Sequence, residues 1–331
     1  TLFYRSIVQT QSNEVRQFNY ILIGILAGIG LLLILSYTGP GKPTSAGETM
    51  ATDTLRTLGS EAGLVKNYAI KLPETVAFAG EKVPLEDFEV KERLDRELLV
   101  NTYWHSNTLQ NLKLAHRYFP VIEPVLKANG IPDDFKYIAL AESGLRNVVS
   151  PAGAEGIWQF LAETARHYGL TVNGEVDERY DVEKATAAAT QYFKDAYQQF
   201  NNWTLAAASY NAGMGGIANS LSYQQVDSYY DLYLNNETSR YVFRILAFKV
   251  IYENTERYGF LLDDEDLYAP LSYRTLTIDS SINNLAAFAT EQQTNYKMLK
   301  VYNPWLRKST LTVKQGESYS LRLPPIAANN Q

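Results

Sequence analysis

The sequence contains no cysteine and only three histidines among its 331 residues. The absence of cysteine excludes disulfides, thiolate metal sites, a cysteine nucleophile and an anchor attached to a lipid-modified cysteine. His105, His116 and His167 are scattered without the spacing of metal ligands, so we expect neither a metal site nor a cofactor. An excess of basic residues is also missing, because the net charge is -6, and this argues against nucleic acid as a partner.

One long hydrophobic run is present, at residues 20–37 (YILIGILAGIGLLLILSY), and it contains no charged residue. As a helix it would be about 27 Å long, close to the thickness of a bilayer core. Tyr20 and Tyr37 suit the two membrane interfaces, and Arg5 and Arg16 precede the run. The run therefore predicts a single-pass transmembrane anchor with a cytoplasmic N-terminus and the remaining residues across the membrane. A cleaved signal peptide, with TSA at 44–46 as its cleavage site, and a buried core helix are the alternatives.

The rest of the chain is predicted to be mainly α-helical. A linker rich in Gly, Pro, Ser and Thr follows the hydrophobic run. From about residue 83 to residue 259, apolar residues recur at three- and four-residue spacing, which is typical of helices. The clearest helices are expected at residues 132–143, with Pro132 at the first helical position, at 182–200, at 203–213 with Gly213 as the stop, and from 235 to a stop at Gly259.

The last 60 or so residues have a different pattern. Residues 273–278 and 318–324 are predicted strands, and two short helices are expected between them, the first capped by Ser280 or Ser281. This β-α-α-β order indicates a small separate module. The expected segments are 1–41 for the cytoplasmic tail and anchor, 42–72 for the linker, 73–112 for an N-terminal helical segment, 113–262 for the main domain and 263–331 for the module.

A single carboxylate, Glu142, stands out on the predicted helix at 132–143. Phe135, Ile138, Ala139 and Glu142 share one helical face, and that face is otherwise apolar. Desolvation should raise the pKa of Glu142, as an acid that protonates a glycosidic oxygen near neutral pH requires. The alternative is a buried ion pair between Glu142 and an arginine such as Arg146, Arg179 or Arg240.

Polar residues in glycine-rich surroundings follow Glu142. In residues 147–160 (NVVSPAGAEGIWQF), Gly153 and Gly156 allow close approach to a ligand, and Gln159 offers a donor and an acceptor to a sugar. In residues 206–216 (AAASYNAGMGG), Tyr210 and Asn211 end an apolar helix at a glycine-rich turn. Taken alone, each motif is more often a matter of packing and turn formation.

Together and in this order, the motifs resemble those of the lytic transglycosylases with a lysozyme-like catalytic domain. They are E-S at 142–143, S-x-x-G-A-x-G-x-x-Q-F at 150–160, Y-N-A-G at 210–213 and E-T-x-x-Y-V at 237–242. The sequence around them is similar to the membrane-bound lytic transglycosylase D group over about residues 73–260. Four motifs in order at the spacing of a domain make the resemblance specific.

The resemblance implies an enzyme that cleaves the β-1,4 bond between N-acetylmuramic acid and N-acetylglucosamine in peptidoglycan glycan strands and leaves 1,6-anhydro ends. It implies that Glu142 is the catalytic acid/base. With the hydrophobic run, it implies a bacterial inner-membrane protein whose catalytic domain lies in the periplasm. The residues expected to bind substrate are Gln159, Tyr210, Asn211 and Tyr241, together with Ser143 and Ser150, which match the motifs but can serve the turn instead.

The C-terminal module resembles a LysM glycan-binding domain in its second helix and last strand. The Gly-Asp pair usual after the first strand is missing, and Ile278-Asp279-Ser280-Ser281 stands there. Two expectations therefore remain open for the LysM-like module: it binds glycan, or it packs on the catalytic domain as a cap.

Two other functions remain as alternatives. One is a hydrolase of the same fold, which normally needs a second carboxylate. Glu155 and Glu163 are nearest in sequence, but neither lies at a motif position, so a mechanism with one carboxylate fits better. The other is a catalytically silent peptidoglycan-binding scaffold. Gly144 after the E-S pair and Phe243 in place of a common proline depart from the family pattern, although neither removes a chemical group from the site.

Overall fold

The structure is a computed structural model that describes residues 68–326. Contacts divide the chain into Thr1–Asn67 and Tyr68–Gln331, and the description below concerns the second unit. The predicted anchor at residues 20–37 and most of the predicted linker lie outside the described residues. Among the described residues, no helix is both long and apolar enough to cross a membrane.

The main domain is almost entirely helical, which confirms the mainly α-helical part of the predicted fold class. A short antiparallel hairpin, formed by β1 (Ala77–Phe78) and β2 (Glu81–Lys82), precedes the helices. The helices are α3 (Phe88–Tyr103), α4 (His105–Ala128), α5 (Lys136–Ser143), α6 (Ala162–His167), α7 (Val182–Phe200), α8 (Trp203–Ala212), α9 (Met214–Gln224) and α10 (Asn236–Glu253).

Local capping explains where some of these helices begin and end. The side chain of Asp181 accepts hydrogen bonds from the first turn of α7, and that of Asn202 does the same for α8, so both helices start where the sequence predicts. One expected helix start and one expected helix stop are wrong. Pro132 precedes a 3₁₀ turn, Asp133–Phe135, rather than opening the α-helix. Helix α10 stops before Asn254, whose side chain donates to the carbonyl of Val250, so Gly259 ends only a later 3₁₀ turn.

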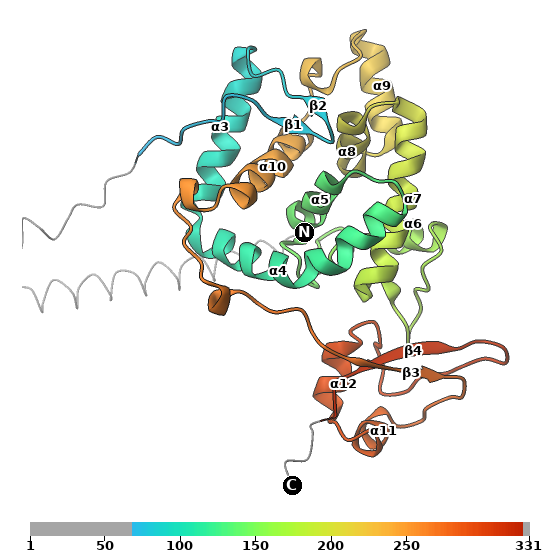
Figure 1. The fold of residues 1–331 in the computed structure, drawn as a ribbon. Coiled ribbons are helices and arrows are strands. Elements are labelled where there is room, and N and C mark those ends of the chain that lie inside the picture. The colour runs from blue at the N-terminus through green and yellow to red at the C-terminus, as the bar shows by residue number, and fades with distance from the viewer. Residues whose placement is uncertain (1–67, 327–331) are drawn as a thin grey trace, which may run out of the picture. The chain divides into compact units, whose positions relative to one another are not determined.

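The core of the main domain surrounds α5. Figure 1 shows α5 in the middle of the domain, between α4 and α10, and it contacts both of these helices. Phe135, Ile138 and Ala139 are fully buried, which confirms the predicted apolar face. The ring of Phe135 lies 4.6 Å from that of Phe193 and 5.2 Å from that of Trp203, measured between centroids. The short helix that carries Glu142 is therefore held on several sides by large side chains.

The C-terminal module has the predicted β-α-α-β order. Its elements are β3 (Arg274–Ile278), α11 (Leu285–Glu291), α12 (Tyr296–Tyr302) and β4 (Tyr319–Leu323), and β3 pairs antiparallel with β4. The predicted cap of the first helix is wrong. Asn284, directly before α11, accepts hydrogen bonds from the backbone of the first turn at 3.0 and 3.1 Å, whereas Ser280 and Ser281 lie too far ahead of it.

The module packs on the main domain through a segment of that domain. Val176 and Tyr180 belong to the main domain in sequence but are buried in the hydrophobic core of the module. The backbone N–H of Asp177 donates to the carbonyl of Trp305 at 2.9 Å. The guanidinium of Arg307 lies 4.1 Å from the centroid of the Tyr180 ring. The structure therefore shows the module packed on the main domain, and glycan binding by the module stays a prediction.

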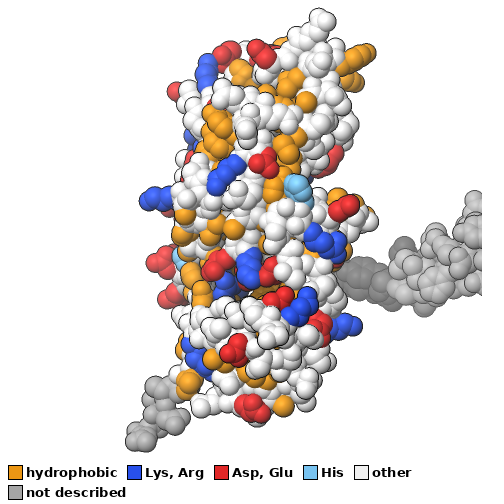
Figure 2. Space-filling view, turned by 90° about the vertical axis from the view of Figure 1, so that its right-hand side faces the viewer, with side chains coloured by type: hydrophobic (Ala, Val, Ile, Leu, Met, Phe, Trp, Pro, Cys, Tyr) orange, Lys and Arg blue, Asp and Glu red, His pale blue; other side chains and the backbone are white. Residues whose placement is uncertain are grey.

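Charged side chains of both signs are scattered over the face shown in Figure 2. Figure 2 shows lysines and arginines interspersed with aspartates and glutamates on one face, without a large area of either sign. Several of the charges are paired. Lys82 contacts Glu86 at 2.7 Å on the surface, whereas the buried Lys136 contacts Glu123 and Asp133 at 2.7 and 2.6 Å. This face offers no basic surface of the kind that binds nucleic acid.

Candidate active site

Glu142 lies in the last turn of α5, where the chain leaves the helix. Gly144 ends the helix in the left-handed region, with a φ of 58°, and its N–H donates to the carbonyl of Leu140 at 2.9 Å. A Cβ atom at this position would lie 2.6 Å from Oδ1 of Asn111. The departure from the family pattern at Gly144 therefore has a structural reason, because the turn after Glu142 has no room for a side chain.

The carboxyl group of Glu142 has one hydrogen-bond partner among the described side chains. The hydroxyl of Tyr241, which projects from α10 and is 1% exposed, donates to Oε1 of Glu142. The structure therefore brings together two residues that the sequence predicts for the site and that lie 99 positions apart.

The predicted alternative, an ion pair at Glu142, is wrong. Among residues 68–326, no lysine, arginine or histidine lies within 4.0 Å of the Glu142 carboxylate. Each arginine proposed for this role has other partners. Arg146 donates to Asn111 at 3.0 Å and Asn107 at 3.3 Å, Arg179 pairs with Asp177 at 2.7 Å, and Arg240 pairs with Glu97 at 2.6 Å.

The surroundings of Glu142 favour its protonated form. Burial raises the pKa of Glu142 to about 7, against the opposing effects of the Tyr241 hydrogen bond and the positive charge of Arg244. The negative charge of Glu237 adds a smaller upward shift to this pKa. Near neutral pH the carboxyl group is therefore poised between its two protonation states, as an acid that must also act as a base requires.

Tyr210 and Asn211 end α8 next to this carboxyl group. The hydroxyl of Tyr210 donates to the carbonyl of Trp158 at 2.7 Å. Burial, and then the charge of Glu142, raise the pKa of Tyr210 well above its ordinary value, so it stays a neutral phenol near the acid. Oδ1 of Asn211 accepts a hydrogen bond from the hydroxyl of Thr238 at 3.0 Å. The predicted Tyr-Asn pair is thus held against both the 143–160 loop and α10.

Of the three other predicted residues, Ser143 ends α5 and Ser150 and Gln159 lie in the loop between α5 and α6, and the side chains of all three bond to this loop. The hydroxyl of Ser143 donates to the carbonyl of Ile157 at 2.8 Å, and that of Ser150 accepts from the N–H of Ala154 at 3.0 Å. Nε2 of Gln159 donates to the carbonyls of Val148 and Gly156 at 3.0 and 2.7 Å. In this structure the two serines hold the loop together. The amide oxygen of Gln159 receives no hydrogen bond from another described residue.

A buried arginine, Arg179, fixes the same loop. The sequence indicates it only as a possible ion-pair partner of Glu142. Arg179 is 4% exposed and pairs with Asp177 and, at 3.1 Å, with Glu155. Its Nη1 also donates to the carbonyl of Phe160 at 3.1 Å. A Cβ atom on Gly156 would lie 2.0 Å from the carbonyl oxygen of Arg179, so this glycine is required by close approach of the two backbones. The only sequence signal for this role of Arg179 is the charged triplet Asp177-Glu178-Arg179 before a helix. The triplet alone does not specify which residues Arg179 contacts.

Neither candidate for a second carboxylate is available beside Glu142. Glu155 accepts a hydrogen bond from Tyr180 at 2.5 Å in addition to its ion pair with Arg179. Glu163 lies exposed in the first turn of α6. The carboxylate whose charge acts on Glu142 is instead Glu237. Within residues 68–326, no cluster of three or more possible ligands is arranged to hold a metal ion.

Comparison with known proteins supports the order of motifs and modules. The family model of the Transglycosylase SLT domain matches residues 120–232. The family model of the Soluble lytic transglycosylase C-terminal LysM-like domain matches residues 274–326.

Similar proteins carry related names. The Membrane-bound lytic murein transglycosylase D of Escherichia coli strain K12 is 29% identical over 244 residues, which cover 71% of this chain and 52% of that protein. The Soluble lytic murein transglycosylase of the same strain is 31% identical over 114 residues, covering 32% of this chain and 18% of that protein. A solved structure of the 70 kDa soluble lytic transglycosylase from Escherichia coli is 28% identical, with a TM-score of 0.37, over 46% of this chain and 27% of that one.

The chain spans about half the length of the membrane-bound relative. The two domain matches lead to one assignment: residues 120–232 match the Transglycosylase SLT domain, residues 274–326 match the C-terminal LysM-like domain of soluble lytic transglycosylases, and the chain is similar to lytic murein transglycosylases.

Proposed function

We propose that this protein is a membrane-anchored lytic transglycosylase that cleaves the β-1,4 bond between N-acetylmuramic acid and N-acetylglucosamine in peptidoglycan. The observation that carries the proposal is the state of Glu142. It is a carboxyl group without an ion-pair partner among the described residues, with a pKa raised to about 7 and a single hydrogen bond from Tyr241. Such a group can donate a proton to a leaving oxygen and then accept one.

In the first step, protonated Glu142 donates its proton to the bridging oxygen, and the bond between this oxygen and C1 of the muramic acid breaks. The leaving sugar departs with a new hydroxyl group. The 2-acetamido group of the muramic acid stabilises the positive charge that develops at C1, a role that a second carboxylate has in many glycosidases. This route suits a site in which Glu155 is already paired and Glu163 lies exposed on another helix.

In the second step, ionised Glu142 takes the proton from the C6 hydroxyl of the same sugar, and this oxygen attacks C1. The product is a 1,6-anhydro ring, Glu142 is protonated again, and no water is consumed. An intramolecular hydroxyl has a large effective concentration, so it competes well with water. Tyr241 would orient the carboxyl group, while Gln159, Tyr210 and Asn211 would hold the sugar and Ser143 and Ser150 would keep the loop in place.

The test is digestion of purified sacculi, with mass spectrometry of the released fragments. We expect 1,6-anhydro muramic ends from the wild type. Glu142→Gln keeps the size and the Tyr241 contact but cannot donate the proton. Because general acid–base catalysis contributes about 10²–10⁴-fold and one residue serves in both steps, we expect a loss at or above the upper end.

Three outcomes would contradict parts of the proposal. Reducing muramic ends without anhydro ends would identify a hydrolase of the same fold. No release by a folded wild type would identify a silent peptidoglycan-binding scaffold. Full activity of the Glu142→Gln variant would show that the acid is another residue.

The location and division of the chain are part of the proposal. The hydrophobic run at residues 20–37 would anchor the protein in the bacterial inner membrane, with the N-terminus in the cytoplasm and the catalytic domain in the periplasm. The chain would divide into the tail and anchor at 1–41, the linker at 42–72, a helical segment at 73–112, the catalytic domain at 113–262 and the module at 263–331. Deletion of residues 1–41 should release the protein from membranes, and cleavage of the catalytic domain by protease from the cytoplasmic side would refute the orientation.

A further inference from the structure

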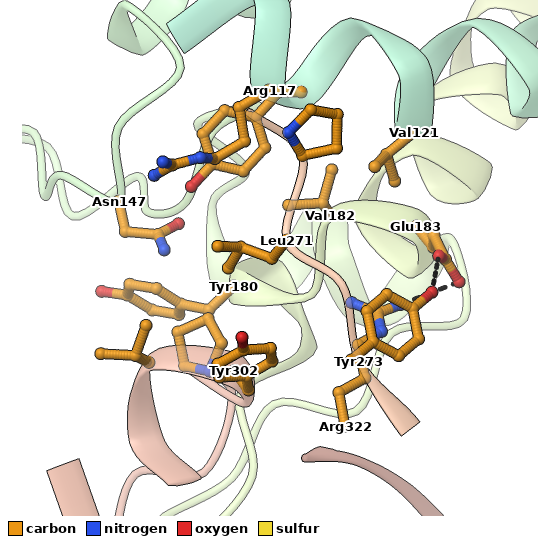
Figure 3. A pocket seen from close by; sticks show the side chains of 14 residues that line it. Arg117, Val121, Asn147, Tyr180, Val182, Glu183, Leu271, Tyr273, Tyr302 and Arg322 are labelled. Carbon is orange, nitrogen blue, oxygen red and sulfur yellow. Dashed lines mark hydrogen bonds and ion pairs between the residues drawn. The ribbon is translucent and has the colours of Figure 1, made fainter. Parts of the chain in front are cut away.

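A pocket lies where the catalytic domain, the module and the segment that joins them meet. We call it the junction pocket. Helix α4 and the start of α7 form one side, the end of α12 and strand β4 form the other, and the connecting segment with Leu271 passes through it (Figure 3). The loop that follows Glu142 contributes Asn147. Glu142 itself does not line the junction pocket, so the junction pocket is distinct from the candidate active site.

The interior of the junction pocket is mainly apolar and aromatic. The rings of Tyr118, Tyr180 and Tyr302 line it together with the side chain of Leu271. Pockets of this kind, at the meeting of two domains and with a few polar groups, are the usual form of a ligand site. The lining suits a ligand that has methyl groups or other small apolar parts.

The two arginines at the rim differ in whether a carboxylate pairs with them. Arg322 is paired with Glu183 at 2.8 Å and lies 3.8 Å from Asp181. Arg117 uses Nε to donate to the carbonyl of Ala269 at 3.1 Å, and none of its nitrogens lies within 4.0 Å of a described carboxylate.

Asn147 is exposed, and its side-chain amide makes no hydrogen bond with the described residues. Figure 3 shows the Arg117 and Asn147 side chains on the same side of the pocket, without an interaction between them. The rim therefore presents a positive charge and an amide to a ligand with a carboxylate.

The pocket is connected to the active site by a short, fixed piece of chain. Asn147 follows Glu142 by five positions, so their Cα atoms are at most about 18 Å apart. Gln159, a predicted substrate-binding residue, donates to the carbonyl of Val148 at 3.0 Å and so holds the backbone beside Asn147. A four-residue peptide in extended form spans about 13 Å, a length of the same order as this upper bound.

We propose that the junction pocket binds the acidic stem peptide of peptidoglycan while the muramic acid that carries it occupies the active site. The inference rests on the proposed function, because that function supplies the peptide-bearing glycan. Stem peptides combine alanine methyl groups with free carboxylates, which match the aromatic interior and Arg117. The protein then selects glycan strands that retain their peptides, and the module contributes to this selection by forming half of the pocket.

The test compares two substrates: glycan strands with their stem peptides, and the same strands after an amidase has removed them. The measured quantity is the ratio of kcat/KM for the two, from the release of anhydro ends by the full chain. We expect the wild type to prefer peptide-bearing strands. Arg117→Gln should lower this ratio about tenfold or more, the effect of losing one charge-assisted hydrogen bond. Asn147→Ala should lower it less, because a neutral amide is lost.

Lys113→Gln is the matched control. Lys113 lies one turn before Arg117 on α4, carries the same charge and does not line the pocket, so its removal should keep the ratio. Arg117 also contacts the connecting segment, so Arg117→Gln can lower stability as well as binding. The thermal midpoint of each variant is therefore measured. Asn147→Ala tests the pocket without removing the contact between Arg117 and the connecting segment.

A ratio near one in the wild type, or a ratio unchanged in both Arg117→Gln and Asn147→Ala, would overturn the inference and leave the proposed function standing. Absence of anhydro ends from both substrates would overturn the proposed function and the inference with it. As a second measurement, a free alanine-containing acidic tetrapeptide is titrated into the Glu142→Gln full chain. Binding that Arg117→Gln abolishes supports the pocket, and no binding at millimolar peptide contradicts it.

Discussion

Replacement of Glu142 by glutamine should leave the free energy of unfolding nearly unchanged at acid pH and raise it at alkaline pH. The folded protein holds the Glu142 proton more tightly than the unfolded chain does, because burial raises the pKa from 4.5 to about 7. Below pH 4.5 Glu142 is mostly protonated in both the folded and the unfolded state, so it does not lower the stability of the folded state. As the pH rises to 7, the unfolded chain releases the proton first, so the wild type loses stability across this range. Glutamine has no proton to lose.

The expected size of this effect follows from the shift. One pKa unit corresponds to about 1.4 kcal/mol, so the rise from 4.5 to about 7 corresponds to roughly 3 kcal/mol of folding free energy lost by the wild type at alkaline pH. The glutamine amide oxygen can still accept the hydrogen bond from Tyr241, so the variant keeps that contact. Above pH 8 the variant should therefore be more stable than the wild type by up to about 3 kcal/mol.

The assay is urea unfolding of the wild type and of Glu142→Gln at pH 4 and pH 8. We expect nearly equal unfolding free energies at pH 4 and a clear advantage of the variant at pH 8. Glu163→Gln, at an exposed position on α6, is the control and should show no such pH-dependent difference. A difference between wild type and Glu142→Gln that stays constant with pH, or that favours the wild type at pH 8, would refute the argument that burial holds this carboxyl group protonated.

Four other outcomes are expected. The value of kcat/KM should fall above about pH 7 as the proton donor ionises, which a pH–rate profile on soluble glycan fragments measures. Tyr241→Phe removes a hydrogen bond that favours the ionised acid, so the alkaline limb of that profile should move to higher pH and the rate should fall. Gly156→Ala should lower the thermal midpoint strongly because of the 2.0 Å clash with Arg179, whereas Gly153→Ala, in open space at a φ of 79°, should cost only about 1–2 kcal/mol. Truncation near residue 271 should lower stability and affinity for sacculi while a folded remainder still forms anhydro ends, and complete loss of turnover would show that the module completes the active site.

The helices were predictable where the pattern depends on neighbours in sequence. The bounds of α7 and the stop of α8 follow from an aspartate or asparagine cap, an amphipathic period and a glycine. The failures at Pro132 and Gly259 have the same origin: a 3₁₀ turn and an α-helix share their start and stop residues, and only packing decides between them.

The site was predictable in its members and less so in its contacts. The apolar face around Glu142 indicates an acid with a raised pKa, and burial produces that shift. The sequence could not tell whether an arginine would pair with it, because Arg146, Arg179 and Arg240 find their partners through tertiary contacts. Nor does spacing place Asn147 and Tyr302 of α12 in the lining of one pocket, since this placement depends on how the two domains pack.

Val176 and Tyr180 complete the hydrophobic core of the module although they come from the middle of the catalytic domain. A module cut out at its sequence boundary therefore leaves behind part of its own interior and exposes Trp305 and Leu306 to water. Grafted onto another enzyme, it would need a host with matching side chains in the corresponding loop. An exchange of modules between relatives should therefore succeed only when the 176–180 segment is transferred with the module. Fusion designs that treat residue 274 as a clean joint should yield chains that express poorly or aggregate.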